Sequence, residues 1–108
     1  MNKQLKFTYD DVDYTLEFTR RTVEMMERNG FQISEIAEKP MTMLPTLFQG
    51  AFLSRHRSVK RDKINEIYSK MSNKQDLISK LVEMYNEPIA TLLEDDENEG
   101  NVDWTTCW

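Results

Sequence analysis

The chain has 108 residues, of which 39% are hydrophobic and 31% are charged. This length fits one domain that can bury a core without a metal or a disulfide, and the composition excludes wholesale disorder. No apolar run approaches the roughly 18 residues that indicate a membrane span. With no signal-peptide pattern at the N-terminus and a single cysteine, we expect a cytoplasmic protein that does not contact membranes.

The charge is unevenly distributed along the chain. The net charge is −5, yet residues 1–80 hold 14 basic and 11 acidic groups, whereas residues 81–108 hold 8 acidic groups and no basic group. Such asymmetry is typical of a folded body followed by a charged tail. We therefore divide the chain into a single globular domain, 1–93, and an acidic, tryptophan-containing C-terminal tail, 94–108.

The first predicted element is a β-hairpin over residues 4–18. Apolar residues alternate with polar ones in two runs, which are Leu5, Phe7, Tyr9 and then Tyr14, Leu16, Phe18. This period of two is typical of strands with one buried face. Pairing Tyr9 with Tyr14 puts all six on that face and makes Asp11-Val12 a two-residue loop, although valine suits such a turn poorly.

Helical patterns fill the next stretch, residues 19–57. Thr19 or Thr22 can cap a helix that ends at Asn29-Gly30, since glycine readily adopts the left-handed conformation after a helix. A short helical turn is expected within 31–38, ended by Pro40. Residues 41–57 predict an apolar helix with Pro45 in its first turn and Gly50 where another helix crosses closely.

Two further helical patterns follow the basic segment 55–63. Residues 61–71 predict one helix, and Ser72-x-x-Gln75 resembles a capping box that opens the next. Pro88 is expected to break that helix near Glu87 and leave a short final helix. The predicted fold class is therefore α+β and mostly helical, with the N-terminal two-stranded antiparallel hairpin packed on about five α-helices within 19–93.

The sequence offers little for catalysis. His56 is the only histidine, and we expect it at the surface at a helix end. Cys107 lies in the acidic tail, a poor setting for a nucleophile. The sequence shows neither metal-ligand spacing nor a glycine-rich phosphate loop. We therefore expect a protein that is not an enzyme, with no catalytic residues, no metal site and no cofactor.

Candidate partner-binding residues lie in the tail and near Pro45. Trp104 and Trp108, with Val102 nearby, either fold back onto the core or anchor a partner; the anchor is slightly favoured, because 1–93 already holds enough apolar residues for a core. Met41 and Met43 suit a core or an adaptable binding groove, and the core is the more common use.

The chain also resembles, over nearly its whole length, the small tail assembly chaperones of long-tailed phages and prophages of Gram-positive hosts. The resemblance rests on the hairpin segment 7–18, the segment Met43-Leu-Pro-Thr-Leu-Phe-Gln-Gly-Ala-Phe-Leu53, and the segments 67–71, 83–88 and 99–104. It implies a non-catalytic helper of tail morphogenesis. Such a helper binds the tape measure protein and helps recruit tail tube subunits in the bacterial host cytoplasm, and is absent from the mature virion.

Two expectations about partners remain beside this one. The alternative function is a small regulatory or nucleic-acid-binding adaptor that uses the basic loop 55–63. That loop has no interleaved aromatic residues and the sequence pI is about 4.9, so no nucleic acid is expected. The basic body and acidic tail are complementary in sign and predict weak, salt-sensitive homo-oligomers.

Overall fold

The computed structural model describes residues 3–93 and 105–107 of the chain. The elements, in chain order, are β1 (Leu5–Tyr9), β2 (Val12–Leu16), α1 (Arg20–Arg28), the 3-10 turn η1 (Ile33–Glu35), α2 (Pro40–Gly50), α3 (Arg61–Lys70) and α4 (Lys74–Leu92). An α+β fold with an N-terminal antiparallel hairpin is thereby confirmed. The described residues form four α-helices, where about five were expected.

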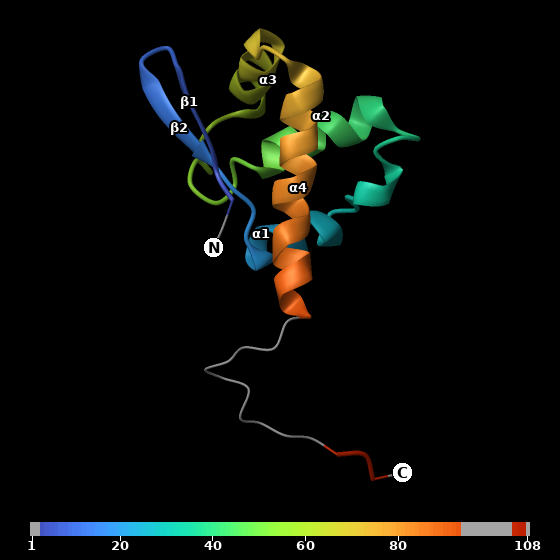
Figure 1. Ribbon diagram of the computed structural model, residues 1–108. Coiled ribbons are helices and arrows are strands. Elements are labelled where there is room, and N and C mark those ends of the chain that lie inside the picture. Colours follow the sequence, from blue (N-terminus) through green and yellow to red (C-terminus); the bar gives the residue numbers. More distant parts are fainter. Residues whose placement is uncertain (1–2, 94–104, 108) are drawn as a thin grey trace.

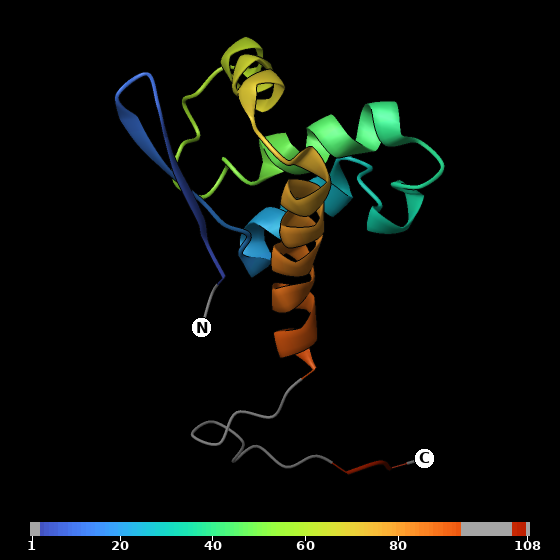
Figure 2. The ribbon, with the colours of Figure 1, turned by 45° about the horizontal axis from the view of Figure 1, so that its top comes forward.

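Helix α4 is the longest element and stands at the centre of the molecule (Figure 1). The hairpin lies to one side of α4, α3 lies near its N-terminal end, and α1 packs against its second half (Figures 1 and 2). Helix α2 packs against α1, α3 and α4. In the part of the chain that the structure describes, no helix is both long and apolar enough to cross a membrane.

The register of the hairpin differs from the prediction. The loop is Asp10-Asp11, with φ of +50° and +63°, and the pairs on the apolar face are Leu5–Leu16, Phe7–Tyr14 and Tyr9–Val12. The loop expected at Asp11-Val12 is therefore wrong. A two-residue loop of this kind needs positive φ at both positions, which aspartate tolerates and β-branched valine resists. The shift is by two residues, so the apolar side chains stay on one face.

The start and end predicted for the first helix are confirmed. Thr19 is the N-cap of α1, and Thr19 and Thr22 satisfy each other's backbone N–H groups through their side chains. After Asn29, Gly30 takes a φ of +92°, which ends the helix. The close crossing expected at Gly50 is also found, because a Cβ atom there would clash with the thioether of Met26 in α1.

Both internal prolines behave differently from expectation. Pro40 and not Pro45 occupies the first turn of α2, which ends at Gly50, and α4 continues through Pro88 to Leu92. Proline removes one helical hydrogen bond, but Pro88 is buried against the body, and this packing offsets the loss. The capping box expected at Ser72 is absent from the described helix start, where Asn73 is the N-cap, with φ +50° and no side-chain hydrogen bond.

The core lies where the apolar face of the hairpin meets α1, α2, α3 and α4. Its largest fully buried side chains are Tyr85, Phe18, Phe48, Phe52, Leu16, Leu47, Ile67 and Leu81. Each contributes roughly 1.5–3 kcal/mol through removal of apolar surface from water. Among the residues after position 93, the structure describes Thr105, Thr106 and Cys107, and all three are exposed.

The positive φ of the hairpin loop leads to a first prediction. Asp11→Gly should raise the free energy of unfolding by about 0.5–1 kcal/mol, because glycine adopts the left-handed region without a Cβ penalty. Asp11→Ala should lower it, since alanine at φ +63° is strained. Asp10 stays unchanged because it accepts a hydrogen bond from Lys63. Urea denaturation measures both variants, and a loss of stability in Asp11→Gly would contradict this turn geometry.

Candidate functional site

A groove runs along the seam between α1 and α4. One hollow, of about 360 Å³, has a mostly apolar lining, which consists of Arg20, Val23, Glu24, Glu27, Pro88, Ile89 and Leu92. A second, of about 340 Å³, is lined by Glu27, Phe31, Gln32, Ile33, Ser34 and Tyr85. Glu27 lines both hollows, so they are neighbours along the seam between α1 and α4, and we call the two together the α1–α4 groove.

Helical spacing explains why these side chains line up. Tyr85, Pro88, Ile89 and Leu92 are three, four and seven residues apart and therefore share one face of α4. The α1 wall repeats this spacing at Arg20, Val23, Glu24 and Glu27. The Arg20 guanidinium donates to the carbonyl oxygen of Thr91 at 2.9 Å, which joins the start of α1 to the end of α4. At 1.5 Å per residue, the α4 wall is about 10 Å long.

The end of α4 exposes large apolar side chains beside this groove. Leu92 is 64% exposed and Leu93 is 87% exposed, and Ile89 is partly exposed. Single exposed apolar residues are ordinary, but a contiguous row beside an apolar groove is typical of a docking surface for another protein. The α1–α4 groove with Leu92 is therefore the candidate site.

The two glutamates of the groove differ in their ion pairing. Glu24 forms an exposed ion pair with Arg28 at 2.6 Å, whereas no lysine or arginine of the described residues lies within ion-pair distance of Glu27. The Tyr85 side chain, 1% exposed, forms part of the groove wall. Its burial, and secondarily the nearby Glu27 charge, raise the pKa of Tyr85 to about 12, so its hydroxyl stays protonated.

The residues proposed from the sequence do not gather at this groove. Met41 is 90% exposed in the first turn of α2, while Met43 lies in the core. Val102, Trp104 and Trp108 lie outside the described residues. Sequence reasoning missed Val23, Ile89 and Leu92 as site residues. The available signal was the run of apolar residues after Pro88, immediately before the acidic tail.

The basic loop 55–63 is partly engaged inside the molecule. Arg55 Nε donates to Glu17 Oε2 at 2.8 Å. Lys63 Nζ donates to Asp10 Oδ2 at 3.0 Å and lies 5.0 Å from the centre of the Tyr9 ring. Two of the five basic side chains of this loop therefore serve internal ion pairs, which reduces the positive field available to a polyanion.

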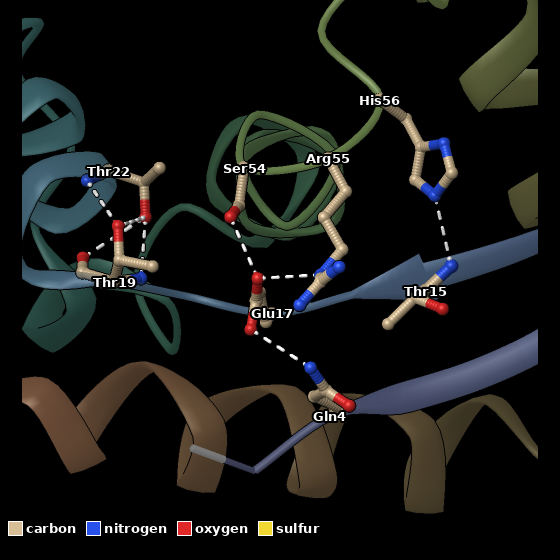
Figure 3. Close-up of polar contacts among 8 residues, drawn as sticks. All are labelled: Gln4, Thr15, Glu17, Thr19, Thr22, Ser54, Arg55 and His56. Atoms are coloured by element: carbon tan, nitrogen blue, oxygen red, sulfur yellow. Dashed lines mark hydrogen bonds and ion pairs between the residues drawn. The ribbon is translucent and has the colours of Figure 1, made fainter.

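A polar cluster attaches the hairpin to the segment after α2 (Figure 3). The buried Glu17 carboxylate accepts hydrogen bonds from Gln4 at 3.2 Å, Ser54 at 2.9 Å and Arg55 at 2.8 Å. His56 Nε2 accepts the backbone N–H of Thr15 at 3.0 Å. These contacts join the hairpin to the segment after α2, and the cluster therefore supports the fold.

The position expected for His56 is wrong. The imidazole is half-buried and packs edge-on against Tyr14 and Phe52, with ring centroids 5.1 Å and 6.3 Å away. It therefore covers the apolar face of the hairpin. Among residues 3–93 and 105–107, no group of three His, Cys, Asp or Glu side chains could hold a metal ion.

Comparison with known proteins identifies one family. The sequence profile described as a domain of unknown function, DUF5055, matches residues 1–108. The chain belongs to the DUF5055 family. Searches among curated proteins and among solved structures gave no match. The α1–α4 groove and the Glu17 cluster are thus features of a DUF5055 domain.

The Glu17 cluster makes the stability of this DUF5055 domain depend on pH. Burial raises the pKa of the Glu17 carboxyl, but the hydrogen bonds from Gln4, Ser54 and Arg55, with the Arg55 charge, outweigh burial and hold that pKa below its ordinary value of 4.5. A lowered pKa in the folded state means that Glu17 stabilises the fold above pH 4.5. This contribution is lost as pH falls through the folded-state pKa.

Glu17→Gln should therefore lower the free energy of unfolding at pH 7 by about 2 kcal/mol, because a neutral amide replaces the charged partner of Arg55. The difference should shrink at a pH below the folded-state pKa, where the wild-type carboxyl is also protonated. Urea denaturation across acid and neutral pH measures this. Glu38→Gln, at an exposed site, is the control. A loss from Glu17→Gln that is equal at every pH would contradict the assignment.

Proposed function

We propose that this protein is a non-catalytic phage tail assembly chaperone that binds the tape measure protein and helps recruit tail tube subunits during tail morphogenesis. It acts in the bacterial host cytoplasm and does not remain in the mature virion. The observation that carries the proposal is the α1–α4 groove, which Leu92 lines, together with the exposed apolar side chains of Ile89, Leu92 and Leu93 at the end of α4. The resemblance of the sequence to tail chaperones supports the choice of client.

The dimensions of the groove suit one face of a helix. An amphipathic helix binds in a groove through apolar side chains at positions i, i+3, i+4 and i+7. Seven residues of helix span about 10 Å, the length of the α4 wall from Tyr85 to Leu92. Tape measure proteins of the resembled systems are long and helical, so they offer many such faces. Burial of Leu92 and Ile89 against a client helix supplies the driving force.

The C-terminal tail is the proposed second contact. It follows Leu93 directly in the sequence and contains Val102, Trp104 and Trp108 among six carboxylates. Tryptophan is enriched at the energetic centres of interfaces. In this proposal the groove holds a client helix, and the tail adds reach and solubility. Weak, salt-sensitive homo-oligomers along a long client extend the same proposal.

Substitution of Leu92 tests the proposal. Leu92→Glu should leave the melting temperature nearly unchanged, because the side chain is largely exposed, and should weaken client binding at least about tenfold by placing a charge in an apolar contact. Co-expression with the tape measure protein of the same phage or prophage, followed by co-purification and a solubility measurement, provides the readout.

Val12→Glu is the matched control for that experiment. It introduces the same charge at an exposed apolar residue of β2, away from the groove. Binding should survive in Val12→Glu and fail in Leu92→Glu. Unchanged solubility of the tape measure protein with the wild-type chain would refute the chaperone function, and equal losses in the two variants would refute the groove as its site.

A further inference from the structure

Glu27 occupies a special position in the α1–α4 groove. It is the one residue that lines both hollows, with Val23, Ile89 and Leu92 on one side and Phe31 and Tyr85 on the other. A helix that fills the groove would therefore cover the Glu27 carboxylate. A carboxylate that is covered without a partner loses hydration and gains nothing in return, which weakens binding.

The groove does not itself supply a cation for Glu27. Arg20 is held by the carbonyl oxygen of Thr91, and Arg28 is paired with Glu24 on the exposed side of α1. Tyr85, which is 1% exposed, and Phe31 line one hollow together with Glu27. A carboxylate that a client helix covers is an acceptor suited to an ammonium or a guanidinium group.

We propose that the α1–α4 groove binds a client helix that places a lysine or arginine against Glu27, with apolar residues one turn away on each side. This inference rests on the proposed function and defines the chemistry of the client. The apolar side chains enter the two hollows about seven residues apart, and the cation stands at the third or fourth position between them. Helices of the same apolar pattern that carry glutamate at this position are rejected by charge repulsion.

The acidic tail of the same chain does not fit this groove. Residues 81–108 contain no lysine or arginine, so the tail cannot supply a cation for the exposed Glu27 if it covers the groove. Its carboxylates would instead add negative charge beside Glu24 and Glu27. The charge pattern therefore favours a basic amphipathic helix of another protein as the occupant of the groove. The negative charge of the tail attracts such a basic client over a longer range.

The test uses two synthetic helical peptides of about 16 residues, which is roughly four turns. They have the same apolar residues seven positions apart and differ at one intervening position, which is lysine in one peptide and glutamate in the other. Fluorescence anisotropy measures their affinity for the full chain and its variants. The wild type should bind the lysine peptide about tenfold more tightly than the glutamate peptide. Glu27→Lys should reverse this preference, and Glu27→Gln should abolish it.

Three variants of the full chain control the experiment. Glu38→Lys makes the same change in net charge at an exposed site away from the groove, and should keep the preference of the wild type. Leu92→Glu should weaken the binding of both peptides. Trp104→Ala tests the tail as occupant: a higher affinity for the lysine peptide in this variant would mean that the tail fills the groove, which would overturn the proposal.

The other outcomes are equally decisive. Equal binding of the two peptides by the wild type, no binding of either, or the same preference in Glu27→Lys would overturn the proposal. A wild-type dimer that Glu27→Lys dissociates, measured by sedimentation, would identify a second copy as the occupant and also overturn it. Failure of the charge preference is distinguishable from failure of the chaperone function. If the tape measure protein still binds, and Leu92→Glu still weakens that binding, then the proposed function stands even when the two peptides bind equally.

Discussion

Burial of the Tyr85 ring holds together α4, the end of the hairpin and the segment after α1. The ring meets Phe18 from the end of the hairpin and Phe31 from the segment after α1 edge-on, with centroids 5.3 Å and 5.2 Å away. A buried aromatic ring contributes both its large area and this favourable edge-to-face geometry. Because Tyr85 lies midway along α4, these contacts fix α4 along α1. The α1–α4 groove exists only because that packing holds.

The hairpin depends on a second, polar attachment. An isolated two-stranded hairpin is marginal in water, so its position must be fixed by other contacts. The outer edge of β2 is covered by the segment after α2, because Thr15 donates its backbone N–H to His56 and Glu17 donates its own to the carbonyl oxygen of Ala51. This also protects the edge from pairing with another chain. Glu17 directly precedes Phe18, so the polar cluster holds the chain where Phe18 enters the core.

The sequence predicts features that short segments determine by themselves. Apolar alternation located the hairpin, and Thr19 with Gly30 located the ends of α1. The hairpin register was missed because it follows from the φ preferences of a two-residue loop more than from the apolar pattern. The course of α4 through Pro88 was missed because burial against α1 outweighs local propensity. The groove was missed because it brings Glu27 close to Tyr85, which is far away in the sequence. No local sequence pattern predicts such a long-range contact.

The end of α4 is poorly suited to stability alone. The unbroken helix carries Leu92 and Leu93 into solvent, and the carboxylates that begin at Glu94 follow the helix end, where the macrodipole favours cations. Apolar exposure promotes association, and a dense negative charge limits it. A sequence selected only for a stable fold would place lysine or arginine at this helix end and polar residues at positions 92 and 93. Local features that disfavour folding are expected at functional or strained sites, and here they meet at the end of α4, beside the α1–α4 groove.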